Sequence, residues 1–211
     1  MTERPQSYRF HQGDRVLPFA PAEYDARLKG LRAIMEENGV EVAVFTSMHN
    51  IAYYSGFLYC SFGRPYGLVV TATDSVTISA GIDAGQPWRR CHGDNITYTD
   101  WQRDNFWRAV LQVAGEGKVV GCEADHLTLL QSEKLNAFLK PARGVDIAPA
   151  TMRQRMRKSQ AELDLIRHGA GVADVGGYAI RVVVRDGALE SDISMAGRDS
   201  MDLEIAKRLL Q

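Results

Sequence analysis

Strand-like runs alternate with helical segments through most of the chain, and this order limits the fold more than any other feature of the sequence. Residues 21–39 begin with a proline, end with a glycine and repeat apolar side chains at helical spacing, which predicts a helix with one buried face. The runs 40–45, 66–73 and 75–80 are rich in apolar and β-branched residues. The last two are joined at Asp74, which predicts a β-hairpin.

The alternation continues beyond the hairpin. Residues 95–101 and 118–124 are predicted as strands, residues 103–115 and 128–140 as helices, and residues 144–150 as a short closing strand. Interleaved strands and helices favour an α/β fold, a three-layer domain in which helices flank the sheet. The hairpin predicts that this β-sheet is mixed rather than all-parallel.

The pattern changes after the last predicted strand. Basic residues cluster ahead of Ser159, which forms a capping-box pattern with Glu162 at the start of a long helix, and a second helix is predicted from about Ser191. Two helices with apolar faces cannot bury those faces on each other alone. We therefore expect one complete domain, residues 1–155, followed by the start of a truncated second domain, residues 156–211.

The first of these two helices carries four glycines between residues 169 and 177. A dinucleotide fingerprint would need Gly-x-Gly-x-x-Gly directly after a strand, but these glycines lie inside a helical pattern with a different spacing. The sequence favours close helix packing here. It also contains no Gly-x-Ser-x-Gly elbow for serine catalysis.

Charge and composition exclude several classes of protein. The formal net charge is −1, with basic residues spread along the chain, which argues against nucleic-acid and membrane-surface binding. The residues before Glu23 do not resemble a signal peptide, and no apolar run is long enough to span a bilayer. Cys60, Cys91 and Cys122 are too scattered for a disulfide framework or a Cys-x-x-Cys metal site. We expect a cytoplasmic protein.

Residues 122–126, with the sequence CEADH, are the strongest metal candidate in the chain. They could form one corner of a metal site, or the end of a strand followed by an acidic loop that enters a helix. The second interpretation is favoured because no other ligands of a complete set are evident and the five histidines form no paired motif. We expect neither a metal nor another cofactor.

Three segments combine aromatic residues with arginine at the ends of predicted strands: 59–70, 85–90 and 98–107. Arginine presents a planar, permanently charged fork that binds a carboxylate through two hydrogen bonds, and an aromatic ring can pack beside the ligand. Aromatic residues and arginine are also enriched at subunit interfaces. The spacing predicts contact with a small carboxylate-bearing ligand, an interface, or both.

Long runs of the chain resemble the N-terminal region of the creatinases, the creatine amidinohydrolases, within the superfamily that also holds the Xaa-Pro peptidases. The resemblance rests on FTSMHNIAYYSGFLYCSFGRPYGLVV, DAGQPWRR, NITYTDWQRDN and MRQRMRKSQAELDLIRHGAGVADVGG, and extends from about Gly13 to Lys207. It implies an N-terminal α/β domain followed by the first helices of an incomplete α+β "pita-bread" domain. It also implies a cytoplasmic homodimer that hydrolyses creatine to sarcosine and urea without a metal.

The resemblance also assigns two substrate-binding residues. Arg64 would hold the substrate carboxylate and Phe62 would pack beside the substrate, both reaching across the dimer into the partner's active site. The family's catalytic histidine, and the glutamates that bind the guanidinium end of creatine, would lie beyond Gln211, and His168 does not match the catalytic position. No catalytic residue is therefore assigned, and we expect the chain alone to be inactive.

Two other interpretations stay open at this point. The chain could be a non-catalytic dimerisation or binding module from a truncated gene. It could also be the N-terminal part of an Xaa-Pro dipeptidase-like metallohydrolase, because the residues that distinguish the substrates would lie outside this chain.

Overall fold

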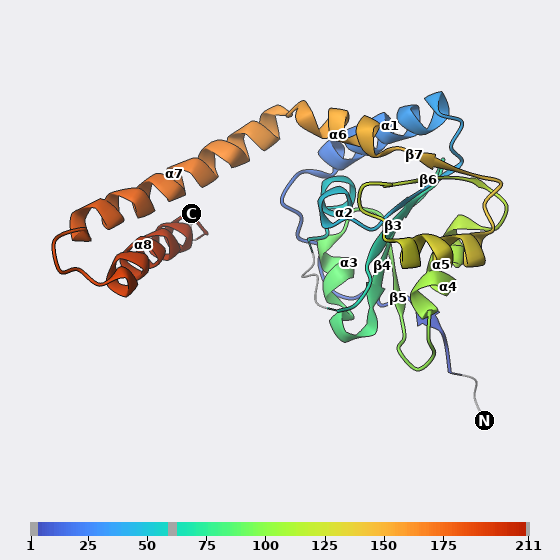
Figure 1. Ribbon diagram of the computed structural model, residues 1–211, viewed down its shortest axis with the longest axis horizontal. Coiled ribbons are helices and arrows are strands. Elements are labelled where there is room, and N and C mark those ends of the chain that lie inside the picture. Colours follow the sequence, from blue (N-terminus) through green and yellow to red (C-terminus); the bar gives the residue numbers. More distant parts are fainter. Residues whose placement is uncertain (1–3, 59–62, 210–211) are drawn as a thin grey trace. The chain divides into compact units, whose positions relative to one another are not determined.

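The computed structural model describes residues 4–58 and 63–209, and the chain divides into two compact units (Figure 1). The first unit extends to Met156 and the second begins at Arg157. The sheet and all the strands belong to the first unit, whereas the second consists of two helices.

A seven-stranded mixed sheet forms the centre of the first unit, in the order β1-β5-β4-β3-β2-β6-β7. Its strands are β1 (Ser7–Tyr8), β2 (Val42–Phe45), β3 (Gly67–Val70), β4 (Ser75–Ala80), β5 (Asp94–Tyr98), β6 (Val119–Cys122) and β7 (Arg143–Asp146). β3 pairs antiparallel with both β2 and β4, whereas β2–β6, β6–β7 and β4–β5 are parallel pairs. The predicted hairpin and the mixed sheet are confirmed.

Helices cover both faces of this sheet. In Figure 1, α4 and α5 lie against one face, and α1, α2, α3 and α6 lie on the other side. Their bounds are α1 (Pro21–Glu37), α2 (Met48–Ser55), α3 (Gln86–Arg90), α4 (Asn105–Ala114), α5 (Leu129–Leu139) and α6 (Ala148–Met156), and a 3-10 turn covers Gly81–Asp83. The three-layer α/β architecture predicted from the alternation is confirmed.

The core of this unit lies where the predicted apolar faces meet. Leu31 of α1 is fully buried, as are Phe45, Leu68 and Ile78 on three adjacent strands. Local signals set the helix ends: the Ser47 side chain caps α2, and Gly56 ends it in the left-handed region at φ 79°, which glycine adopts without steric cost. Thr128 caps α5 by accepting a hydrogen bond from the Gln131 amide at 3.2 Å.

One expected element differs in the structure, and one short helix was not expected. The run 144–150 was predicted as a strand, but the strand ends at Asp146 and α6 begins at Ala148. The Asp146 carboxylate accepts the amide of Ala148 at 3.0 Å, so it holds the first turn of a helix. Residues 86–90, to which the sequence assigned no element of their own, form the short helix α3 with Pro87 in its first turn.

The N-terminal arm docks on its own unit. β1 pairs antiparallel with β5, and further along the arm His11 stacks on Trp88 with ring centroids 3.8 Å apart. The Arg15 guanidinium lies 3.7 Å from the centre of the same ring, and Arg9 and His11 both pair with Asp94. The aromatic–arginine segment around Trp88 therefore anchors the arm.

The second unit is a pair of helices, α7 (Gln160–Val183) and α8 (Glu190–Leu209). The predicted capping box is present, with Ser159 and Glu162 exchanging hydrogen bonds at 3.2 and 2.9 Å. A Cβ atom at Gly176 would lie 2.7 Å from Met201 Cγ, so α8 approaches α7 closely at this glycine. Close helix packing, rather than dinucleotide binding, explains the glycine at this position.

Candidate functional site

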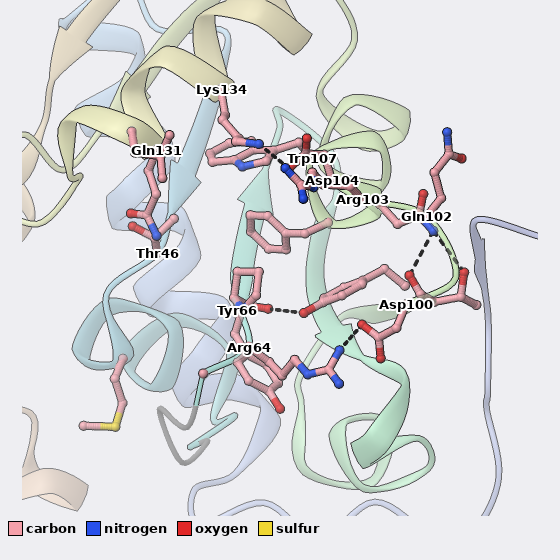
Figure 2. Close-up of a pocket in the computed structure, with 18 of the residues that line it drawn as sticks. Thr46, Arg64, Tyr66, Asp100, Gln102, Arg103, Asp104, Trp107, Gln131 and Lys134 are labelled. Carbon is pink, nitrogen blue, oxygen red and sulfur yellow. Dashed lines mark hydrogen bonds and ion pairs between the residues drawn. The ribbon is translucent and has the colours of Figure 1, made fainter.

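A cavity of about 880 Å³ opens at the edge of the sheet where β2, β5 and β6 end (Figure 2). It is lined by the segments that follow these three strands, by the segment that leads into β3, and by the first turns of α4 and α5. The carboxyl ends of parallel strands are the usual place for ligand sites in open α/β sheets. The volume is that of a site for a small molecule.

Arg64, one of the two site residues implied by the resemblance, lies at one end of this cavity. Its guanidinium pairs with the carboxylate of Asp100, in the segment that follows β5, and both side chains are 42% exposed. The guanidinium is therefore neutralised by a residue of its own unit while staying open to solvent. Phe62 lies outside the described residues, so the structure places only one of the two.

Two tyrosines fix the backbone around Arg64. The Tyr98 hydroxyl donates to the carbonyl oxygen of Pro65 at 3.0 Å, and the Tyr66 hydroxyl donates to the carboxylate of Asp83. Burial raises the pKa of Tyr98, and the nearby Asp100 raises it further, whereas Arg64 lowers it. Tyr98 consequently remains a neutral hydrogen-bond donor at physiological pH.

The other end of the cavity lies between α4 and α5. Lys134 of α5 pairs with the carboxylate of Asp104, the residue before α4, and Figure 2 shows this pair well separated from Arg64 and Asp100. Asp104 has φ 67°, in the left-handed region where side chains other than glycine are strained. Its side chain caps none of the α4 amides that the structure describes. Trp107 lines the same end and is almost completely buried (Figure 2).

A buried carboxylate, whose structural role the sequence did not predict, joins the end of β6 to the start of α2 beside the cavity. Glu123 is 3% exposed and accepts the backbone amides of Thr46 and Ser47, each at 2.9 Å. It also accepts the Asn50 side-chain amide at 2.7 Å and the Ser47 hydroxyl. These four donors occupy the carboxylate as a structural anchor at the start of α2. The sequence signal was an acidic residue directly after a buried strand.

The remaining metal and thiol candidates have ordinary structural environments. His126 hydrogen-bonds the Thr46 hydroxyl at 3.1 Å, and among the described residues no group of three or more His, Cys, Asp or Glu could hold a metal ion. Burial raises the pKa of the Cys91 and Cys122 thiols, which makes both poor nucleophiles at neutral pH. Cys60 lies outside the described residues.

The family assignment follows from the sequence of the first unit. The sequence model of the Creatinase/Prolidase N-terminal domain matches residues 27–157. The chain belongs to this family. A curated creatinase from Bacillus sp. (strain B-0618) is 46% identical over 200 residues, which cover 92% of this chain and 49% of the relative.

More distant proteins resemble this chain in sequence or in fold. An uncharacterised hydrolase/peptidase, y4tL, of Sinorhizobium fredii is 26% identical over 86% of the chain and 50% of its own length. The prolidase from Pyrococcus horikoshii OT3 superposes on this chain with a TM-score of 0.71 and is 16% identical in sequence. The superposition covers 85% of this chain and 49% of the prolidase chain. The dipeptidase PepE from Mycobacterium ulcerans superposes with a TM-score of 0.66 and is 21% identical in sequence. This superposition covers 88% of this chain and 51% of the PepE chain.

This member of the creatinase/prolidase family spans about half the length of the curated relatives that it matches. Within the described residues, every helix is too short or too polar to cross a bilayer.

Proposed function

We propose that this chain is the N-terminal half of a creatinase-type hydrolase, which converts creatine and water to sarcosine and urea. The observation that carries the proposal is the 46% identity to a creatinase over nearly the whole chain. The alternative, an Xaa-Pro dipeptidase-like enzyme, has less support because the prolidase and dipeptidase structures cited above are only 16% and 21% identical and show the fold alone.

In this proposal, Arg64 and Phe62 serve the active site of a partner subunit in a homodimer. Arg64 lies in a half-exposed position at the rim of a cavity, which suits a side chain that contacts a ligand brought by another molecule. Its guanidinium can bind the creatine carboxylate through charge-assisted hydrogen bonds. The substrate carboxylate must then share Arg64 with Asp100, or displace it.

In this proposal the 211-residue chain supplies contacts to the substrate but no catalytic residue, so it is inactive by itself. Hydrolysis needs a proton donor within hydrogen-bond reach of the substrate, and the resemblance places that histidine outside this chain. An assay of sarcosine release on the purified chain should give no turnover above the buffer blank. Measurable turnover would contradict this assignment of roles.

A chimera that joins this chain to the other half of the Bacillus creatinase tests the role of Arg64. Arg64→Ala should raise KM for creatine about tenfold to a hundredfold with a smaller change in kcat, because a charge-assisted contact is worth about 1.5–3 kcal/mol. Asp100→Asn should lower KM for creatine several-fold, because it removes the carboxylate that competes with the substrate for Arg64.

Arg143→Ala is the matched control, since Arg143 lies at the start of β7 and donates to the Asn38 carbonyl. Its KM should equal that of the unmodified chimera. If Arg64→Ala leaves KM unchanged while the protein stays folded, Arg64 does not bind the substrate.

A further inference from the structure

The N-terminal arm holds the segment 99–102, which carries Asp100. The backbone amide of Thr99 donates to the Gln6 carbonyl at 2.9 Å, and the Thr99 hydroxyl donates to the Pro5 carbonyl at 2.8 Å. These bonds lie directly beyond the antiparallel pairing of β1 with β5. The arm therefore extends its contact with the sheet edge into the segment that borders the cavity.

Two further side chains bind the same segment to the arm. The Trp101 indole nitrogen donates to the Pro5 carbonyl at 2.7 Å, and the Gln6 side-chain amide donates to the Gln102 side chain at 3.1 Å. Three of the four residues in the segment are thus bound to the arm, and Asp100 is the fourth.

The Asp100 side chain itself pairs with Arg64 (Figure 2). Its neighbour Thr99 is held by α4 as well as by the arm, because the Asn105 side-chain amide donates to the Thr99 carbonyl at 2.9 Å. A group whose backbone is already ordered loses less entropy when it forms a contact. Asp100 therefore pairs more strongly with Arg64 than it would in a free segment.

We propose that Trp101 is a positioning residue through which the N-terminal arm sets the affinity of Arg64 for an anionic ligand. The inference rests on the proposed function, in which the creatine carboxylate displaces Asp100 or shares Arg64 with it. Trp101 is not among the described residues that line the cavity, so it acts through Asp100 rather than on the ligand. Releasing the segment from the arm weakens the internal pair and strengthens binding of the ligand.

Nitrogen-15 NMR on the 211-residue chain tests the internal pair without any substrate. Trp101→Phe keeps an aromatic ring at a partly exposed position and removes the donor to Pro5. The guanidinium protons of Arg64 should then exchange with water about twofold to tenfold faster, because the segment has lost one hydrogen bond. Ser7→Ala is the matched control, since the Ser7 hydroxyl binds the arm to Gln112 of α4 at 3.0 Å, and it should leave the exchange unchanged. Unchanged exchange in Trp101→Phe, or an equal rise in both variants, would overturn the proposal.

The chimera with the Bacillus creatinase half tests the effect on the substrate. Trp101→Phe should lower KM for creatine about twofold to fivefold with a smaller change in kcat, in the same direction as Asp100→Asn. In the Asp100→Asn background it should change KM no further, because the carboxylate that it releases is absent.

The Arg64→Ala chimera separates failure of this inference from failure of the proposed function. Where Arg64→Ala raises KM, a raised or unchanged KM for Trp101→Phe, or an equal fall in both backgrounds, would overturn the role of the arm. Where Arg64→Ala leaves KM unchanged, the proposed function fails, and the exchange rates alone decide whether the arm holds Asp100 against Arg64.

Discussion

At the scale of single residues, Glu123 anchors the start of α2 beside the cavity through four hydrogen bonds. Glu123→Gln should lower the free energy of unfolding by about 2–4 kcal/mol, because the amide cannot accept from all four donors and leaves buried groups unsatisfied. Chemical denaturation followed by circular dichroism measures this change. The control is Glu116→Gln, which removes an exposed ion pair with Lys140 worth no more than about 1 kcal/mol. Equal losses for the two variants would contradict the anchoring role.

The residues of the site were only partly predictable from the sequence. An arginine among aromatic residues at a strand end identified Arg64 as a ligand candidate, and the structure places it at a cavity. Its partner Asp100 was not predicted, since the pairing depends on β4 lying between the two segments in the sheet. Glu123 was interpreted as part of an acidic loop, because its burial depends on amides contributed by a distant turn. Whether Arg64 and Phe62 bind substrate stays a prediction.

At the scale of elements, the sequence predicted the strand–helix alternation but not α3, β1 or the start of α6. α3 is too short to show an apolar period, and the two-residue strand β1 exists only because β5 offers it an edge. The start of α6 was missed because Ile147 and Ala148 continue an apolar run. The Asp146 carboxylate accepts the amide of Ala148, the first residue of the helix, a contact that hydropathy does not report.

Neighbouring glycines in α7 give a prediction at this scale. Gly176→Leu should destabilise the helix pair by about 1–3 kcal/mol, because its side chain would enter the space of Met201 and the Gly197 carbonyl. Gly177→Leu should stabilise α7 slightly, since no described atom lies within 4 Å of a Cβ there and leucine favours helix. Hydrogen exchange of the α7 and α8 amides measures both. Similar protection in the two variants would show that the helices do not depend on close approach at Gly176.

At the scale of the whole molecule, we expect the proposed homodimer to associate in part through the first unit, because Arg64 belongs to it. Light scattering on the 211-residue chain should therefore give twice the chain mass of 23.4 kDa at micromolar concentrations and above.

The second unit offers another route to association, because it exposes apolar side chains such as Val182 and Leu203, which are 80% and 64% accessible to solvent. Replacing both with lysine separates the two cases. The doubled mass should persist in this variant, whereas a fall to the mass of one chain would locate the contact on α7 and α8. A single-chain mass for the unmodified protein would show that the residues of this chain do not associate by themselves, and a single-chain mass for the chimera as well would remove the assignment of Arg64 to a partner's active site.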